Sequence, residues 1–385
     1  MTALKGLKVL DFTQMMTGPM ATMLLADAGA DVIKVEQPAG DPFRKSGETT
    51  LNGTGAFFLG VNRNKRGIVL DLKTPAGLEA ARALAAEADV FVENFRPGFT
   101  ERLGLGYDDL KKLNPRLIYC SITGFGQSGQ DRNRPALDMV IQAMSGLMQI
   151  TGSQESGPLR TGFPFSDLVT ALMSAIGILT ALEARHRTGE GQRIDLSMMD
   201  ASIFSLVPRD VYFDITGHTP DRLGNEHWDI VPNNTYRTKD GREVMIITIN
   251  DKFWQILCDA IGAPEMKTDP ATASKGARLQ NRELVNRRLA EIFATRTLAE
   301  WDPILLAAGA IYGPVKTWPE VFGDPKVQQD LIRTIDSPST GPFRVINNPL
   351  NFSATPTEIR LPPPALGEHN ESVIPAAAKG WPARI

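Results

Sequence analysis

The strongest constraint on the fold is an alternation of short apolar strands with helical stretches over the first 200 residues. The predicted strands lie at 7–12, 31–35, 67–72, 89–93, 116–122 and 193–197. Strands separated by helices connect through right-handed crossovers and form a largely parallel sheet. The pattern predicts an α/β fold with a doubly wound, mostly parallel sheet, whose ligands bind at the carboxyl ends of the strands.

The pattern changes after about residue 225. A hairpin is expected over 235–246, with Asp240 and Gly241 at the turn. Helices are expected near 251–262, 282–294 and 297–308. We therefore expect a smaller α+β domain beside the large one. The domain boundaries that follow are a large domain at 1–200 completed by 330–385, a small domain at 225–315, and linkers at 201–224 and 316–329.

Charge and composition exclude several classes of protein. Lys and Arg number 41 against 44 Asp and Glu, so no overall basic field exists to bind nucleic acid. The apolar stretch 168–184 contains polar residues and is too short for a comfortable membrane span. Residues 1–8 lack a signal-peptide layout, which favours a soluble, cytoplasmic protein. Cys120 and Cys258 are too few for a disulfide framework, and the four histidines are not spaced as zinc ligands.

A glycine-rich string at 124–129, Gly-Phe-Gly-Gln-Ser-Gly, matches the pattern of a dinucleotide-binding loop. The residues that follow it, 130–135, do not form an amphipathic helix whose N-terminus could hold a pyrophosphate. A plain glycine-rich loop is therefore the better interpretation.

Carboxylate chemistry is the remaining candidate, and it centres on Asp167. Ser166 or Asp167 is expected to cap the long apolar helix that follows. A cap is the commoner role for an aspartate at such a position. A helix N-terminus also favours an ionised carboxylate, so Asp167 should be charged at neutral pH and available as a nucleophile.

Many short motifs in one order give the chain a family resemblance. They are Val9-Leu-Asp-Phe-Thr with Gly18-Pro19, Gly29-Ala-Asp-Val-Ile-Lys-Val-Glu36, Asn62-Arg-Asn-Lys-Arg66, Val92-Glu-Asn-Phe-Arg-Pro-Gly98, Tyr119-Cys-Ser-Ile-Thr-Gly-Phe-Gly126, Gly189-Glu-Gly-Gln-Arg193 and Pro362-Pro-Pro-Ala-Leu-Gly367. Over nearly its whole length the chain resembles the family III CoA-transferases, which include formyl-CoA transferase, carnitine CoA-transferase and succinyl-CoA:dicarboxylate CoA-transferases. The resemblance implies a Rossmann-like large domain.

The resemblance also implies an activity and a set of site residues. The family's catalytic aspartate falls on Asp167, which would move CoA between small carboxylic acids, with dicarboxylic acids favoured, through an aspartyl anhydride and an aspartyl-CoA thioester. The CoA thioester is a substrate, and no tightly bound cofactor is expected. Residues matching the family's CoA contacts are Met15, Met16, Thr17, Leu72, Asn94, Phe95, Phe99, Arg102, Leu103 and Met198. Leu137 and Gly162 are expected near the acceptor acid, and Arg63, Lys65 and Arg66 are expected in the phosphate field.

Family members form interlocked homodimers, so the resemblance implies the same assembly here, with acyl-CoA and carboxylic acids as the other partners. Two alternatives stay open: an α-methylacyl-CoA racemase or epimerase, and an acyl-CoA-binding protein without turnover. The racemases place a histidine where this chain has Leu137, which favours the transferase because a racemase needs two proton-carrying groups. Two further departures are Gln37, where formyl-CoA transferase has a basic residue, and the lack of a tetraglycine loop near 246–251.

Overall fold

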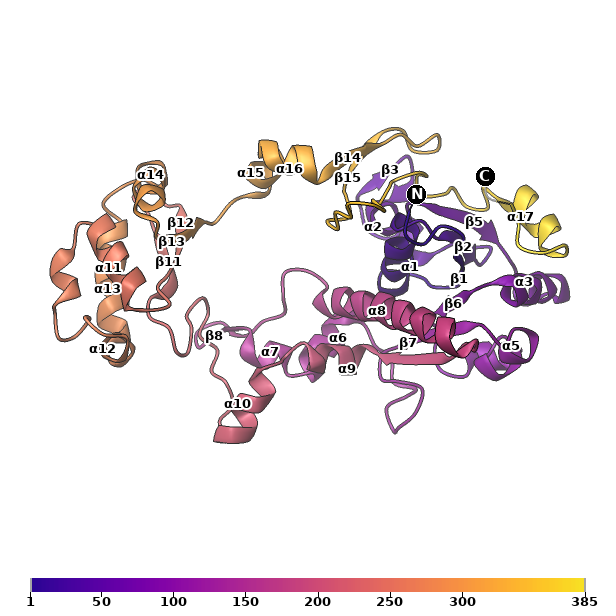
Figure 1. The fold of residues 1–385 in the computed structure, drawn as a ribbon, viewed down its shortest axis with the longest axis horizontal. Coiled ribbons are helices and arrows are strands. Elements are labelled where there is room, and N and C mark those ends of the chain that lie inside the picture. The colour runs from indigo at the N-terminus through magenta and orange to yellow at the C-terminus, as the bar shows by residue number, and fades with distance from the viewer. Residues whose placement is uncertain (1, 384–385) are drawn as a thin grey trace. The chain divides into compact units, whose positions relative to one another are not determined.

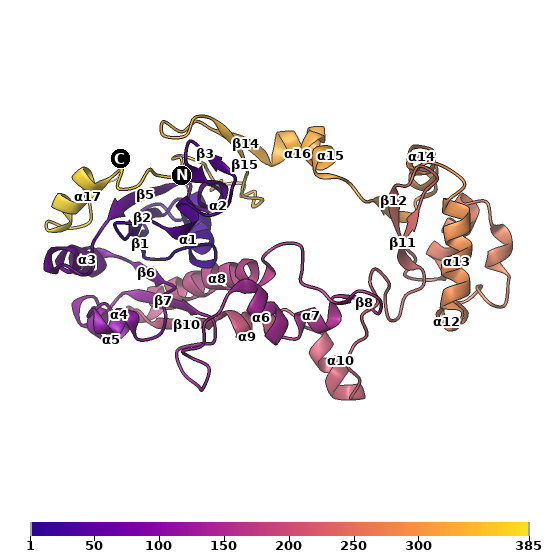
Figure 2. The same ribbon diagram turned by 180° about the vertical axis from the view of Figure 1, so that it is seen from behind.

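A computed structural model describes residues 2–383 of the chain. The chain divides into two compact units. The first comprises the residues up to 147, residues 160–214 and the residues from 325 onward, and the second comprises 148–159 and 215–324. Each unit is described by itself (Figures 1 and 2).

The first unit is built on a six-stranded sheet in the order β10-β7-β6-β1-β2-β5, in which every neighbouring pair is parallel. Its strands are β1 (Lys8–Asp11), β2 (Asp31–Glu36), β5 (Lys65–Val69), β6 (Val90–Glu93), β7 (Ile118–Thr123) and β10 (Arg193–Ser197). The predicted α/β class and parallel sheet are confirmed. Two strands depart from their predicted ranges: β5 begins two residues earlier and ends three residues earlier, and β7 begins two residues later.

Helices cover both faces of this sheet, because alternate residues on each buried strand point in opposite directions. Val9 packs in one core cluster with residues of α1 (Thr17–Asp27) and α8 (Phe165–Thr188). Leu10 packs in the other, with residues of the helices on the opposite face. Those helices are α3 (Pro75–Glu87), α5 (Tyr107–Leu113) and α17 (Asn370–Ala377) (Figure 1).

The edge of the sheet at β5 is covered by a segment from far along the chain. The amide of Gly67 donates to Nδ1 of His369 (3.1 Å), and the amide of His369 donates to the carbonyl of Gly67 (2.9 Å). The amide of Val69 donates to the side-chain oxygen of Asn370 (2.8 Å). An edge strand with unpaired backbone groups is a template for aggregation, and these bonds remove that template.

Buried ion pairs surround the start of β5. Lys65 lies 3.0 Å from Asp11, and both side chains are fully buried. Arg63 and Arg66 each form a 2.7 Å pair, with Asp27 and Asp31 respectively, and both arginines are buried. The expectation that Arg63, Lys65 and Arg66 contribute to a phosphate field is therefore wrong, because their charges are already neutralised inside the fold.

Helix α8 is longer than the apolar stretch 168–184 that lies within it. By length and composition alone, its 24 residues could cross a membrane, although 44% of the relevant 18-residue window is buried inside the protein. Its last turn is held by Arg185, which lies 2.9 Å from Asp89. The helix ends at Gly189, whose left-handed backbone (φ 79°) suits glycine. A core helix of a soluble protein passes the same length test.

The second unit contains an antiparallel sheet, β11 (Asn233–Arg237), β12 (Glu243–Ile247) and β13 (Ile311–Pro314). The predicted hairpin is confirmed, with Gly241 at positive φ in its turn. The helices of this unit, α11 (Asp251–Ala260), α12 (Lys275–Gln280), α13 (Arg282–Phe293) and α14 (Leu298–Ala308), share with the sheet a core that includes Trp254, Phe293 and Trp301.

Shorter elements complete the chain. They are the 3-10 helices η1 (Pro42–Arg44) and η2 (Pro264–Lys267), the strands β3 (Thr50–Leu51), β4 (Thr54–Gly55), β8 (Gly152–Ser153), β9 (Gly157–Pro158), β14 (Ile332–Ile335) and β15 (Phe343–Ile346), and the helices α2 (Ala56–Val61), α4 (Phe99–Arg102), α6 (Asp138–Met144), α7 (Leu147–Ile150), α9 (Met198–Phe204), α10 (Arg209–Thr216), α15 (Trp318–Gly323) and α16 (Pro325–Asp330). Helices α10, α15 and α16 lie in segments where the sequence predicts linkers.

Candidate active site

The candidate site lies where the chain order of the sheet reverses. Strands β1 and β6 are neighbours, but β1 continues to β2 on one side while β6 continues to β7 on the other. The loops after such strands diverge and leave a crevice at the carboxyl end of the sheet. Gln14 and Asn94 join the two loops. The amide of Gln14 donates to the Asn94 side-chain oxygen (2.9 Å), and the Asn94 side-chain amide donates to the Gln14 carbonyl (2.8 Å).

A buried ion pair supports the turn between β1 and α1. Met15 has a left-handed backbone (φ 65°), which costs roughly 1–3 kcal/mol in a residue other than glycine. Its amide donates to the carboxylate of Asp41 (3.2 Å). Lys34, fully buried, lies 2.9 Å from Asp41 and also donates to the Thr13 carbonyl (2.8 Å). These contacts hold the turn in the conformation that presents Thr17.

Asp167 is the third residue of α8, and it is not the helix cap. The residue at the cap position is Pro164, which supplies no side-chain hydrogen bond, so the expectation that Ser166 or Asp167 caps the helix is wrong. Ser166 is buried and accepts a hydrogen bond from the hydroxyl of Ser202 (2.9 Å). The Asp167 carboxylate therefore stays free of a capping role and extends from the first turn of the helix.

Two side chains bracket Asp167. The hydroxyl of Thr17, at the start of α1, donates to Oδ1 of Asp167. The Oδ1 atom of Asp138, the first residue of α6, accepts a hydrogen bond from the backbone amide of Asp167 (3.1 Å). Asp138 is held in turn by the side-chain amide of Gln142 (2.6 Å). Residues from the first turns of α1 and α6 thus contact Asp167, one through its carboxylate and the other through its backbone amide.

Burial raises the pKa of Asp167 to about 6, from an ordinary value of 3.8. The Thr17 hydrogen bond lowers this pKa because it stabilises the ionised form, and the negative charge of Asp138 raises it. Asp167 is therefore still mostly ionised at pH 7, as the sequence predicts. Partial burial leaves the carboxylate poorly solvated, which suits a nucleophile.

Replacing Thr17 with valine should move the acid limb of the pH profile upward. Valine keeps the shape of threonine but removes the hydroxyl that lowers the pKa of Asp167. We expect the acid limb of log(kcat/KM), expected near pH 6 in the parent protein from the pKa of Asp167, to shift by roughly 0.5–1 pH unit toward higher pH. Thr17→Ser keeps a hydroxyl and should stay close to the parent profile.

Asp138→Asn is the matched variant with the opposite expectation. Asparagine keeps an oxygen that can accept from the Asp167 amide but removes the charge that raises the Asp167 pKa. Its acid limb should therefore move to lower pH. Shifts in the same direction for Thr17→Val and Asp138→Asn would show that the limb does not report Asp167.

The Asp167 cavity, of about 420 Å³, brings together residues that are far apart in the sequence. Eight of the predicted site residues line it: Met15, Met16, Thr17, Asn94, Phe95, Leu137, Asp167 and Met198. A second cavity of about 540 Å³ is lined by Leu72, Phe95 and Phe99 among others. Gln14 and Phe95 line both cavities, so the two are adjoining parts of one crevice.

Three predicted residues line neither cavity. Arg102 is exposed at the end of α4, with its guanidinium 5.9 Å from the Phe99 ring centre. Leu103 packs against the core of the first unit. Gly162 lies exposed in the segment before α8.

The sequence assigned no role to Asp138, which follows Leu137, or to Gln14, which follows the motif at 9–13. A carboxylate at the first position of a predicted helix, beside Leu137, is the signal that could have identified Asp138. Glu93 is a third residue of this kind. It accepts a hydrogen bond from the amide of Phe95 (2.8 Å), a residue that lines both cavities, and burial raises its pKa to about 7.

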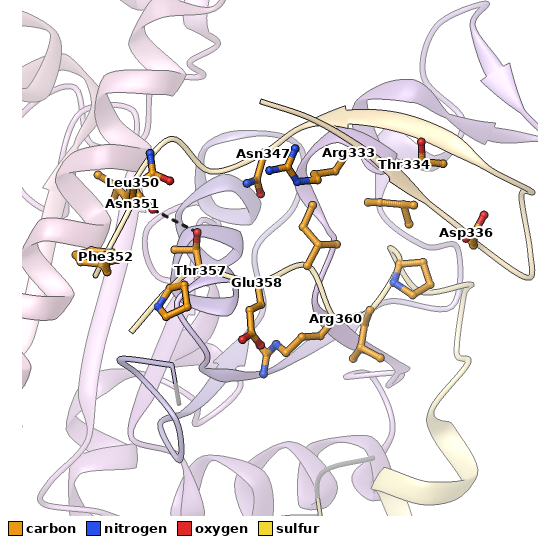
Figure 3. Close-up of a pocket in the computed structure, with 15 residues that line it drawn as sticks. Arg333, Thr334, Asp336, Asn347, Leu350, Asn351, Phe352, Thr357, Glu358 and Arg360 are labelled. Atoms are coloured by element: carbon orange, nitrogen blue, oxygen red, sulfur yellow. Dashed lines mark hydrogen bonds between the residues drawn. The ribbon is translucent and has the colours of Figure 1, made fainter. Parts of the chain in front are cut away.

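A separate cavity of about 540 Å³ lies in the C-terminal part of the first unit and includes none of the predicted site residues (Figure 3). Arg333 and Arg360 line it together with Glu358, which turns toward Arg360 in Figure 3. Arg360 also donates to the carbonyl of Ala26 (2.6 Å). The guanidinium of Arg360 thus stabilises the fold through α1, and we do not include this cavity in the candidate active site.

Comparison with known proteins gives a consistent result. A sequence model of CoA-transferase family III matches residues 4–370. The chain is 37% identical to succinyl-CoA:glutarate CoA-transferase of Mus musculus, over 97% of this chain and 86% of the relative. It is 38% identical to succinyl-CoA:mesaconate CoA-transferase of Haloarcula hispanica, over 99% and 98%. Its structure is similar to a CAIB/BAIF family protein of Brucella suis, with a TM-score of 0.87, 37% identity, and coverage of 96% of this chain and 98% of that one.

Proposed function

This chain belongs to CoA-transferase family III and is an acyl-CoA:carboxylate CoA-transferase, and from that premise we propose that Asp167 is its nucleophile. The observation that carries the proposal is the geometry of this carboxylate. Asp167 lines the cavity at the point where the chain order of the sheet reverses, and its carboxylate accepts a hydrogen bond from the Thr17 hydroxyl. The carboxylate is partly desolvated yet mostly ionised at pH 7. Those are the properties that covalent catalysis by a carboxylate requires.

The proposed first half-reaction has two steps. A carboxylate oxygen of Asp167 attacks the thioester carbonyl carbon of the donor, the C–S bond breaks, and a mixed anhydride and CoA thiolate form. The thiolate then attacks the aspartyl carbonyl carbon of the anhydride and expels the donor acid as its carboxylate. The enzyme is left as an aspartyl-CoA thioester.

The second half-reaction runs the same steps in reverse with the acceptor. The acceptor carboxylate attacks the carbonyl carbon of the aspartyl thioester. This attack forms a new mixed anhydride between the acceptor and Asp167 and releases CoA thiolate. The thiolate attacks the acyl carbon of the acceptor, so acyl-CoA leaves and the Asp167 carboxylate is restored. Covalent catalysis divides one difficult exchange into steps that each have a good leaving group.

We propose that the joined cavities receive CoA, with the thioester beside Asp167 and the nucleotide toward Leu72 and Phe99. Gln14 and Phe95, which line both cavities, would then contact the pantetheine arm between them. The buried Lys34–Asp41 pair supports this role indirectly, because it fixes the turn that carries Met15 and Thr17. Arg102 would reach the nucleotide only from outside the cavities.

The acceptor is proposed to be a small dicarboxylic acid, as the names of the two relatives suggest for those proteins. An interlocked homodimer is proposed on the same family basis. A racemase is disfavoured because the side chain of Leu137, which lines the Asp167 cavity, cannot donate or accept a proton. Deuterium incorporation at the α-carbon without exchange of CoA between acids would reverse that choice.

Trapping with hydroxylamine tests the covalent mechanism. Either acylated form of Asp167, the anhydride or the thioester, should react with hydroxylamine to give a hydroxamate, a change that peptide mass spectrometry detects. We expect modification of the Asp167 peptide only when acyl-CoA donor is present. Free CoA in place of the donor is the control. An unmodified peptide during turnover would exclude Asp167 as the nucleophile.

A further inference from the structure

We infer that Arg132 and Arg134 form a carboxylate-binding subsite that selects acceptors with a second carboxylate. The inference rests on the proposed function and extends it to the residues that determine the substrate class. Both arginines belong to the loop between β7 and α6, and both line the cavity that contains Asp167. Both views of the fold show this loop extending from the end of β7 (Figures 1 and 2).

The charges that line the cavity make a second carboxylate hard to accept without help. Asp138 and Asp167 are both acidic, and they already influence each other through the pKa of Asp167. A dicarboxylic acid that presents one carboxylate to Asp167 brings a second negative charge into the same space. Repulsion between like charges at this range must be offset by a nearby cation.

Arg132 and Arg134 have charges that the fold leaves available. Arg134 lies 3.9 Å from Asp131, and both side chains are roughly half exposed, so the pair adds little to stability. Among residues 2–383, Arg132 makes no ion pair and is exposed. A third arginine, Arg96, also lines this cavity and is exposed, but it follows Phe95, which lines both cavities, so we place it beside the CoA arm rather than beside the acceptor.

The guanidinium group suits this task because its paired N–H groups match the two oxygens of a carboxylate. The position of the loop also fits. It lines the Asp167 cavity but not the adjoining one that contains Leu72, where we place the nucleotide. Leu137, from the same loop, would contact the apolar carbon chain between the two carboxylates of the acceptor.

The test compares two acceptors of equal length, glutarate and pentanoate, with the same acyl-CoA donor. In the proposed mechanism the donor acid leaves before the acceptor reacts, so kcat/KM for the acceptor reports acceptor selection. In Arg132→Ala, Arg134→Ala and the double variant, kcat/KM for glutarate should fall by about 10- to 100-fold, mainly through KM. The value for pentanoate should change less than about twofold. Arg187→Ala, exposed in the last turn of α8, is the control and should preserve the parent ratio.

Three results would overturn the subsite. The ratio of kcat/KM for glutarate to kcat/KM for pentanoate could stay at the parent value in every variant. Alternatively, kcat/KM could fall equally for both acceptors while KM for acyl-CoA rises, which would make the arginines CoA ligands. A parent protein that prefers pentanoate would also overturn it. Failure of the proposed function is distinct, because the parent protein would then give no hydroxamate at Asp167 with any donor.

Discussion

Asp167→Asn should reduce CoA transfer by roughly 10³-fold or more while leaving the fold intact. The amide is nearly the same shape but is a very weak nucleophile, so neither anhydride nor thioester can form. Thr17 can still donate to the amide oxygen, and the contact of the Asp167 backbone with Asp138 is unaffected. The measurement is initial rate with a fixed donor, alongside thermal unfolding.

The stability of Asp167→Asn provides an independent check. The folded-state pKa of Asp167, about 6, lies above its ordinary value of 3.8, so the parent protein loses stability as the pH rises from about 4 to 6. Asparagine does not ionise, so the variant should be at least as stable as the parent at pH 7. Asp108→Asn, an exposed aspartate in the first turn of α5, is the control and should keep full activity. Loss of activity in the control, or residual transfer near the parent rate in Asp167→Asn, would contradict the mechanism.

Lys65→Met should destabilise the first unit by about 3–5 kcal/mol. The change leaves the carboxylate of Asp11 buried without its cation. Burial alone would raise the pKa of Asp11, but Lys65, Lys34 and the hydroxyls of Thr13 and Thr22 together lower it. Asp11 is therefore ionised in the folded protein, and methionine, similar in size to lysine, cannot compensate for its charge.

Urea unfolding of Lys65→Met and Lys8→Met measures this effect. Lys8 forms the matched surface pair, 3.4 Å from Glu87, with both side chains more than one third exposed. Its loss should cost about 1 kcal/mol or less. Similar losses of unfolding free energy in the two variants would mean that the buried pair stabilises the protein no more than the surface pair does.

The parallel sheet was predictable because its strands read as short apolar runs and the intervening helices have clear starting signals. Pro75 begins α3, for example, where the sequence places it. The cations at 63–66 were misjudged for a physical reason. Their partners Asp11, Asp27 and Asp31 precede them by tens of residues, so only the folded sheet reveals that the charges cancel.

The candidate site was predictable in part, and mainly through family resemblance. Position in the sequence alone suggested that Asp167 caps α8, whereas Pro164 occupies the cap position in the structure. Thr17 lies 150 residues from Asp167, and the contact between them depends on α1 and α8 packing on the same face of the sheet. No local pattern encodes that packing, so the hydrogen bond between Thr17 and Asp167, the part of Asp138 and the resulting pKa came only from the structure.

The covering of β5 by residues near His369 has a consequence for how the protein is made in the cell. A ribosome releases the strand long before the residues that shield it, because some 300 positions separate Gly67 from His369. During that interval the nascent chain exposes the unpaired backbone groups of β5, which makes the chain prone to aggregate until its C-terminal residues emerge. A premature stop codon before residue 367 would leave the edge of β5 permanently uncovered.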